Sequence, residues 1–318
     1  MLQQTTVATV RARYARFLER FPDLPALARA TEEQVLAAWS GLGYYARARN
    51  LRLAAREVMR RHGGRLPRDP ETLRTLPGFG EYMASAVAAL AHGVPAPAAD
   101  ANVTRVASRL WAIPGVAGTR PHAAAVRGRV EALLSAGRPG DVLAAVMDLG
   151  QLVCLPRRPS CAACPLADPC AARATGDPER FPAKRARPAL RRRHVAAAWA
   201  TRRGAALLVR GTDALLGGLW QCPAAEGRSA AEAASRLSRT VGELGLALSA
   251  GPPLAATRHT MVHRRLEILI YPAEIAAAAD AVRRPGSVRW FTPERLADAA
   301  IPTLTRRIAS AAGFLPRA

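Results

Sequence analysis

The chain has 318 residues, half of them apolar, and a formal net charge of +22. This length suffices for two domains with separate hydrophobic cores. No apolar run reaches the roughly 18 residues of a membrane span, and the N-terminus lacks the basic and apolar regions of a signal peptide. We therefore expect no membrane association and a reducing, cytoplasmic setting.

Basic residues outnumber acidic ones by 46 to 24, which favours a polyanionic partner such as nucleic acid. Every basic residue except Lys184 is an arginine. Because the chain is also rich in Ala, Gly and Pro, coding drift is an alternative source of the charge. Charge alone therefore leaves the partner open.

Before residue 190, apolar residues recur at helical spacing and no segment has the pattern of a strand. A capping box at Thr31–Gln34, glycines at 63–64 and the Asp69-Pro70 pair mark helix ends. We predict an all-α region with helices over about 7–21, 31–39, 46–61, 69–76, 81–91, 100–111, 120–136 and 141–153.

A Pro- and Arg-rich stretch at 173–193 is typical of a solvated interdomain linker. Beyond it the pattern changes, because strands are predicted over 195–200, 205–210, 266–271 and 288–291, with helices over 229–244 and 293–299. The second region is therefore expected to be an α+β domain. The predicted domain limits are 1–172, a linker at 173–193, and 194–318.

Four of the five cysteines lie within 17 residues, in the pattern Cys154-x6-Cys161-x2-Cys164-x5-Cys170. The loop contains four prolines and can bury little apolar surface, so a covalent or metal staple is expected. Four thiolates suit a tetrahedral zinc ion or a [4Fe–4S] cluster, and the spacing alone does not separate them. Disulfides are disfavoured because nothing else indicates secretion. Cys222 is expected to be buried and inert.

The pentapeptide Leu76-Pro77-Gly78-Phe79-Gly80 lies between two predicted helices, which is the helix-hairpin-helix pattern. Gly78 and Gly80 allow a sharp turn that leaves backbone N–H groups free at the start of the next helix. Such groups bind a phosphate irrespective of the base. An ordinary glycine-rich connection is the alternative interpretation.

Asp100 lies about twenty residues further on, just before another predicted helix. Its simplest role is to cap that helix. A carboxylate at the bottom of a pocket would also stabilise a developing cation. The two roles are compatible, since capping fixes the side chain.

Together these motifs resemble the endonuclease III superfamily of base-excision DNA glycosylases, and within it the MutY-type adenine DNA glycosylases. Residues 1–5, 41–51 and 147–150 resemble that subfamily. Gly217–Trp220 and Arg258–Thr260 resemble its Nudix-like C-terminal domain. The fold implied is an all-α helix-hairpin-helix glycosylase domain with a [4Fe–4S] loop, followed by an α+β Nudix-like domain. The helix over 229–244 has too few Glu residues for a pyrophosphatase, so lesion recognition is expected.

The resemblance implies a bacterial, nucleoid-associated monomer that excises adenine mispaired with 8-oxoguanine or guanine in double-stranded DNA. Its [4Fe–4S] cluster would be held by Cys154, Cys161, Cys164 and Cys170. Asp100 would stabilise the oxocarbenium-like sugar, supported by Asn102, with Tyr82 beside it. The groups implied to contact DNA are Gln3, Gln4, Thr5, Tyr44, Gly78, Gly80 and His263.

The absence of lysine supports a monofunctional enzyme independently of the resemblance. Glycosylases that also cut the strand usually use a lysine amine to form a Schiff base. In bifunctional relatives that lysine occupies the position of Tyr82. Here the glycosylase region has no lysine, and Lys184 lies in the predicted linker.

Three positions depart from the family pattern. The general-acid Glu would lie two residues before Met1, so we expect either that the protein begins further upstream or that this chain binds lesions with little excision. Ala144 stands where the family usually has Gln or Glu to read adenine. Val262 replaces a Ser that contacts 8-oxoguanine, while His263 would retain a contact.

Two other functions remain open at this point. A G:T or G:U mismatch glycosylase of the same superfamily would share the cluster and a tyrosine-type site, but those relatives lack a C-terminal domain. A non-catalytic lesion-binding protein would be consistent with the missing Glu. Base release from different mispairs separates these functions.

Overall fold

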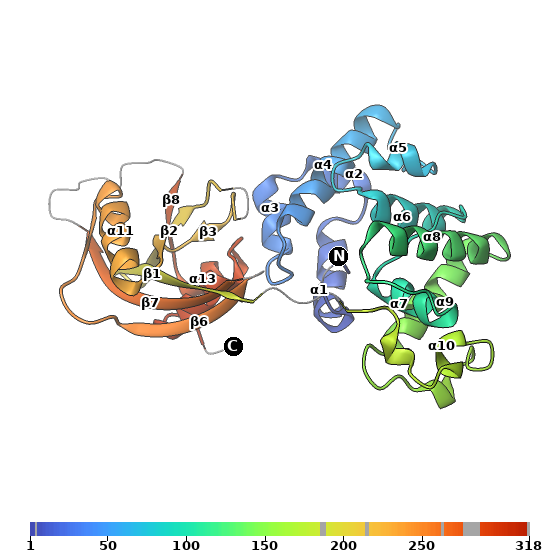
Figure 1. Cartoon of the computed structure of the whole chain (residues 1–318). Helices are drawn as coiled ribbons and strands as arrows, with labels where there is room; N and C mark the ends of the chain where they lie inside the picture. The colour runs from blue at the N-terminus through green and yellow to red at the C-terminus, as the bar shows by residue number, and fades with distance from the viewer. Residues whose placement is uncertain (4, 185–188, 214–215, 262–263, 276–286, 317–318) are drawn as a thin grey trace. The chain divides into compact units, whose positions relative to one another are not determined.

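The computed structural model describes residues 1–3, 5–184, 189–213, 216–261, 264–275 and 287–316. The chain forms two compact units (Figure 1). One contains Met1–Arg56 together with Pro188–Ala318, and the other contains Glu57–Arg187. Each buried apolar cluster lies within one unit.

The second unit is helical. Its core is formed by apolar faces of the central helices, with Ala89, Val103, Val130 and Leu143 all buried. The helices expected here are confirmed to within about two residues at most ends. The unit contains the end of α4 (Ala46–Arg61), α5 (Pro70–Arg74), α6 (Glu81–His92), α7 (Ala101–Leu110), α8 (Arg120–Ser135), α9 (Pro139–Leu152) and α10 (Ala171–Ala174), with 3-10 turns at Cys161–Ala163 and Pro178–Arg180.

Helices α7 and α9 approach closely at one glycine. A Cβ placed on Gly150 would lie 2.7 Å from the Cβ of Asn102, well inside van der Waals contact. The last residue of the Met-Asp-Leu-Gly motif therefore has a packing role, because it lets α9 support α7 near the start of that helix.

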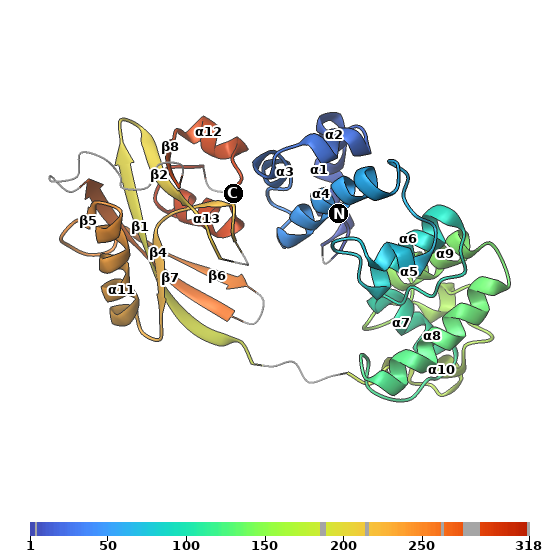
Figure 2. The same cartoon turned by 90° about the horizontal axis from the view of Figure 1, so that it is seen from above.

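In the first unit, a mixed sheet lies between two helices (Figure 2). Strands β1 and β7 are its parallel centre. Alternate residues of β1 face α11 (Ala230–Glu243) on one side and α13 (Thr303–Ala311) on the other. The strands are β1 (Arg191–Arg202), β2 (Ala205–Arg210), β3 (Trp220–Gln221), β4 (Ala224–Gly227), β5 (Leu246–Leu248), β6 (Ala255–Met261), β7 (Arg264–Ile275) and β8 (Val288–Phe291), and α12 (Pro293–Asp298) follows β8.

Three N-terminal helices, α1 (Val7–Arg20), α2 (Leu24–Arg29) and α3 (Glu32–Ala38), belong to the same unit as the sheet. The Tyr45 hydroxyl donates to the Ile301 carbonyl at 3.0 Å, and the Trp220 indole donates to Glu33 at 3.1 Å. Leu219 is fully buried among the apolar residues of these helices. Residues distant in sequence thus form one packed body.

The α+β prediction for the C-terminal region is confirmed, although several elements were not expected. Along the whole chain these are α2, α10, α13 and the strands β3, β4, β5 and β6. Most are short, and the inner face of β6 carries Ala255, Thr257 and His259, with Met261 as its single large apolar side chain. Strand β1 begins at Arg191, inside the range expected to be linker. In the described part of the chain, no helix combines the length and apolarity needed to span a bilayer.

Candidate functional site

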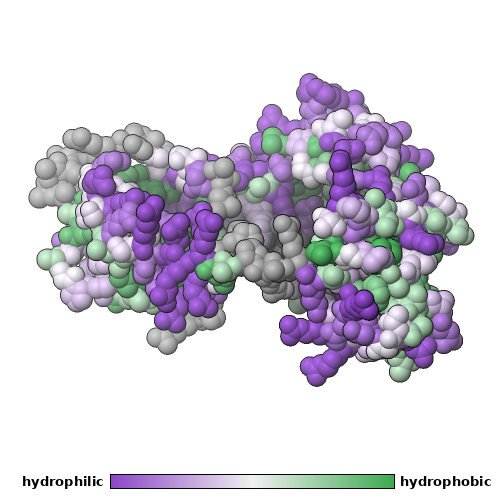
Figure 3. All heavy atoms as spheres, in the orientation of Figure 1, coloured by the Kyte–Doolittle hydropathy of each residue, from purple (hydrophilic) through white to green (hydrophobic). Residues whose placement is uncertain are grey.

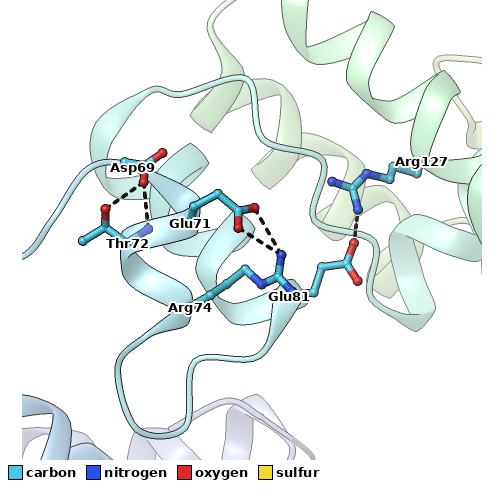
Figure 4. A network of polar contacts seen from close by, with 6 residues as sticks. All are labelled: Asp69, Glu71, Thr72, Arg74, Glu81 and Arg127. Carbon is cyan, nitrogen blue, oxygen red and sulfur yellow. Dashed lines mark hydrogen bonds and ion pairs between the residues drawn. The ribbon is translucent and has the colours of Figure 1, made fainter.

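The turn between α5 and α6 exposes backbone donors. Gly78 has φ +80°, a left-handed conformation that favours glycine. Gly80 is the N-cap of α6 and supplies no side-chain acceptor, so the first N–H groups of α6 are not capped by it. Asp69 fixes the preceding helix, because it accepts from the Thr72 amide at 2.7 Å and hydroxyl at 2.8 Å (Figure 4). This arrangement suits an anion.

Figure 4 also shows that two carboxylates near this turn are paired with arginines. Glu81, the first residue of α6, forms an ion pair with Arg127 of α8. The pairing offsets a carboxylate that would otherwise repel an anion at the helix N-terminus. Glu71 is likewise paired with Arg74 at 3.1 Å. The exposed pairs add little stability.

Asp100 is the N-cap of α7. Its Oδ1 accepts from the Val103 amide at 2.7 Å, as the sequence predicts for a capping residue. Among the described residues, Oδ2 has no recorded hydrogen-bond partner. One oxygen therefore holds the carboxylate in place while the other is available to a ligand.

Tyr82, on the first turn of α6, lies near this carboxylate. Burial raises the pKa of Tyr82, and the negative charge of Asp100 raises it further. The phenol consequently stays protonated at neutral pH and its hydroxyl can donate. The structure thus brings Tyr82 and Asp100 together within one unit.

Arg105 connects the start of α7 to the cysteine loop. Its guanidinium donates to Asn102 Oδ1 at 2.8 Å, to the Gly150 carbonyl at 2.6 Å and to the Cys154 carbonyl at 2.7 Å. Burial lowers the pKa of Arg105, while the charges of Cys154 and Asp100 act in the opposite direction. Asn102 is therefore fixed by a cation that also holds the loop.

Substitution of Arg105 by Met is expected to lower stability by about 2–3 kcal/mol, because the change leaves the Gly150 and Cys154 carbonyls without this donor. The midpoint of thermal unfolding should fall by about 4–10 °C. An Arg105→Lys variant keeps the charge but cannot reach all the acceptors. Its midpoint of thermal unfolding should lie between those of the wild type and the Arg105→Met variant. An unchanged midpoint for Arg105→Met would contradict this role.

The four clustered cysteines line a single cavity of about 30 Å³. None is paired in a disulfide. Burial raises the pKa of Cys161, and the neighbouring Cys170, Cys154 and Cys164 raise it further, since thiolates so close repel one another. A positively charged centre would relieve that repulsion.

Arg109, 3% exposed, lies beside this cavity. It donates to Cys154 Sγ at 3.3 Å and to the Leu155 and Pro156 carbonyls at 2.7 and 3.2 Å. The Cys170 thiol donates to the Arg109 carbonyl at 3.5 Å. A buried guanidinium among four sulfurs is suited to a bound group whose total charge is negative.

The donor set fits an iron–sulfur cluster. In the described residues, no group of three or more His, Cys, Asp or Glu side chains converges tightly enough to bind a single metal ion. The cavity that the four cysteines line exceeds the roughly 10–15 Å³ that one water molecule needs. Cys154, Cys161, Cys164 and Cys170 all line this one space.

In the first unit, a strained turn presents Tyr44. Gly41, Gly43 and Tyr44 have φ of +88°, +68° and +46°. A left-handed conformation is uncommon for tyrosine, and such strain often marks a functional site. The side chain is 48% exposed. Exposure and strain together argue against a simple packing role for Tyr44.

Arg47 fixes this turn to the chain's first residues. Its guanidinium donates to the carbonyls of Met1, Leu42 and Gly43 at 2.9–3.0 Å and also to that of Gln3. The Arg47 cation lies 5.8 Å from the centre of the Tyr44 ring. One arginine thus holds together two segments for which the family resemblance implies DNA contact.

Tyr44 lines a pocket of about 240 Å³ together with His259, Thr260 and Leu304. Burial lowers the pKa of His259, and the charge of Arg307 lowers it further. Among the described residues, His259 Nδ1 has no hydrogen-bond partner. The pocket therefore combines an aromatic ring with an unsatisfied imidazole, as a planar polar ligand requires.

Gln4, Val262 and His263 lie outside the described residues. Gln3 and Thr5 are half-buried at the chain's start, and Cys222 is buried in the sheet core as predicted. Sequence reasoning missed Arg47, Arg105 and Arg109. A signal existed for the last two, because Asn102, Arg105 and Arg109 follow helical spacing along one face of α7.

Comparison with known proteins is consistent with this geometry. Residues 1–131 match the HhH-GPD superfamily of base excision DNA repair proteins, and residues 194–311 match a NUDIX domain. The human adenine DNA glycosylase is 32% identical over 367 residues, covering 97% of this chain and 66% of that protein. The mouse protein is also 32% identical, covering 97% and 69%.

A bacterial relative, the adenine DNA glycosylase of Mycolicibacterium smegmatis, is 40% identical over 58% of this chain and 62% of its own length. A solved thermostable thymine-DNA glycosylase aligns with a TM-score of 0.48 and 28% identity over 55% of this chain and 80% of its own. The chain spans about two thirds of the length of the mammalian relatives it matches.

The hairpin, the capped carboxylate and the two matched regions define a helix-hairpin-helix base-excision repair protein with a C-terminal Nudix-like domain. Within this class, the mouse match covers nearly all of the chain. The chain belongs to the adenine DNA glycosylase family.

Proposed function

We propose that this protein is a monofunctional glycosylase that hydrolyses the N-glycosidic bond of adenine mispaired with 8-oxoguanine or guanine. The observation that carries the proposal is the Asp100 carboxylate, which one hydrogen bond fixes at the start of α7 while its second oxygen stays available. Family membership supports the same activity.

The reaction requires the adenine to leave the base stack. The phosphate-binding turn at Gly78–Gly80 would hold the backbone during this step, through N–H groups at the start of α6. The bond between C1′ and adenine then breaks, and its electron pair leaves with the base. Asp100 stabilises the cationic sugar that remains. Water adds to C1′ and loses a proton, the departed adenine gains one, and the products are the abasic site and neutral adenine.

Asn102 and Tyr82 lie around the Asp100 carboxylate and are proposed to support it. Asn102 is held by Arg105, and Tyr82 supplies a protonated phenol beside Asp100. Tyr82 has no amine, so it cannot form the Schiff base that strand cleavage usually needs. The expected product is therefore an intact strand with an abasic site.

We further propose that Cys154, Cys161, Cys164 and Cys170 hold a [4Fe–4S] cluster that fixes the loop over 154–170. The cluster would supply a structural staple for a segment with few apolar contacts. The protein would act as a monomer on chromosomal DNA in the bacterial cytoplasm.

The pocket beside Tyr44 is our candidate for contacts with the base opposite adenine. The Tyr44 ring would stack on that base or wedge beside it, and His259 would offer a hydrogen-bonding group. Gln3 would contribute through the segment that Arg47 holds next to Tyr44. His263 and Gln4 complete the set on family resemblance alone.

Base release decides between this function and its rivals. The full-length protein should release adenine from A:8-oxoG and A:G duplexes and leave T:G duplexes unchanged. Release of thymine without adenine would identify a mismatch glycosylase instead. Tight binding to the mispairs without release of either base would identify a lesion-binding protein.

Replacement of Tyr44 by Leu should selectively weaken recognition of the oxidised base. Loss of one aromatic stacking contact is expected to cost about 1–3 kcal/mol, or roughly 5- to 150-fold in affinity for A:8-oxoG duplexes. Affinity for undamaged duplexes should change little. A Tyr44→Phe variant, which keeps the ring, is the matched control. Equal weakening on both duplexes would show that Tyr44 acts without regard to the lesion.

A further inference from the structure

Five arginines gather where β1 and β7 begin. Because the two strands are parallel, their first residues lie side by side, with Arg191 opposite Arg264 and Arg192 opposite Arg265. We call Arg191, Arg192, Arg193, Arg264 and Arg265 the arginine rim. Figure 3 shows hydrophilic side chains concentrated over the region occupied by β6 and β7 in Figure 1.

The carboxylates that contact the rim do not neutralise it. In the part of the chain that the structure describes, Glu226 pairs with Arg193 and Arg264, and Glu267 pairs with Arg192. Neither Arg191 nor Arg265 has a recorded carboxylate partner among those residues, and both are exposed. On one face of the sheet Glu226 offsets part of the charge of Arg191, Arg193 and Arg264, and on the other face Glu267 offsets part of the charge of Arg192 and Arg265, so each face keeps an excess of positive charge.

The arrangement opposes the stability of the sheet. Like charges directly opposite one another on neighbouring strands repel, and here one such pair lies on each face of the sheet, because successive residues of a strand point to opposite faces. Apolar or mixed-charge pairs would serve the strands better. A cluster that costs stability and remains exposed is better explained by an anionic partner than by the fold.

The rim also adjoins the candidate base-recognition pocket. Strand β6 ends where β7 begins, so Met261 lies opposite Arg264 and Thr260 opposite Arg265. Met261 and Thr260 both line the pocket that contains Tyr44. The three strand ends span about 10 Å, which matches about three nucleotide steps of one DNA strand.

We propose that the arginine rim binds the phosphates of the DNA strand next to the base received by the Tyr44 pocket. The position of the rim along DNA, next to the base in the pocket, rests on the proposed function. The binding of phosphates by the rim does not depend on that function. The rim contacts no base, so it contributes affinity and register without sequence or lesion preference. Its contribution is therefore predicted to be equal on damaged and undamaged duplexes.

The test is the salt dependence of DNA binding by the whole chain. An Arg191→Gln/Arg265→Gln double variant should lose two phosphate contacts. The slope of log affinity against log salt should become shallower by about two, and affinity near 0.1 M salt should fall about ten-fold. The change should be the same for an A:8-oxoG duplex and for an undamaged duplex.

A matched control removes two arginines from the opposite end of β1. Arg202→Gln with Arg203→Asn makes the same change in net charge, and Asn tolerates the φ of +49° at position 203. This control should keep the slope of the wild type. An Arg191→Lys/Arg265→Lys variant keeps both charges and should bind nearly as the wild type does.

Equal slopes for the Gln double variant and the control would overturn the proposal. Weakening confined to the A:8-oxoG duplex would also overturn it, since phosphate contacts cannot read the lesion. Should the double variant fail to fold, the single Arg265→Gln variant must still reduce the slope by about one. If the wild type does not release adenine, the proposed function is refuted. The salt dependence of DNA binding would still test the arginine rim.

Discussion

Replacement of Asp100 by Asn is expected to slow adenine release from A:8-oxoG duplexes by about 10³-fold or more, measured under single-turnover conditions with the full-length protein. The loss follows because a neutral amide cannot stabilise a cationic sugar. Asn is itself a favourable N-cap and still accepts from the Val103 amide, so α7 should remain intact.

The Asn substitution therefore separates catalysis from capping. Thermal stability and affinity for the mispair should remain close to those of the wild type. An Asp100→Ala variant loses both roles and should also be less stable by about 1 kcal/mol. Undiminished release by Asp100→Asn would show that this carboxylate does not carry the chemistry.

Replacement of Cys164 by Ser should abolish the cluster. The wild type should contain about four irons per chain, with the brown colour of an iron–sulfur protein, and the variant should contain almost none. Without the staple, the proline-rich loop over 154–170 should become accessible to protease, because it buries little apolar surface.

The matched control is Cys222→Ala. Burial raises the pKa of Cys222 to about 12, and its side chain packs in the sheet core of the first unit, whereas the other four cysteines belong to the second. Full iron content is expected for this variant. A colourless wild type with one zinc per chain would replace the cluster assignment by a zinc site. Iron retained in the Cys164→Ser variant would exclude Cys164 as a ligand.

Local sequence rules predicted many of the helices because the signals for them are local. The Thr31–Gln34 capping box, the Gly78–Gly80 turn and the Asp100 cap each depend on residues within one helical turn. The gathering of the four cysteines in one loop could also be predicted, since their spacing alone places them close together. Such features need no knowledge of tertiary contacts.

The long-range contacts of the supporting arginines could not be predicted, because most of their partners are backbone carbonyls. Arg47 binds carbonyls of the first residues, and Arg105 binds those of Gly150 and Cys154, forty or more positions away. Any residue type supplies a carbonyl, so composition carries no trace of these contacts. Only the folded chain shows why an arginine is needed at each position.

The packing of the first helices against the sheet was also beyond local reasoning. It depends on Tyr45 reaching Ile301 and on Gly218 allowing close approach to Glu32. Strand β6 was missed for a related reason, because its inner face carries small and polar side chains beside Met261, and the end of the strand lines the Tyr44 pocket. Where a surface serves binding, the apolar alternation that predicts strands is weakened.

The most direct test of the account compares the affinity of the protein for two duplexes that differ in one charge. One contains a protonated pyrrolidine in place of the sugar that loses adenine, and the other contains a neutral tetrahydrofuran. Wild type should bind the cationic duplex about 10²-fold more tightly, and Asp100→Asn should bind both alike. An equal preference for the cation in wild type and variant would contradict the role of Asp100.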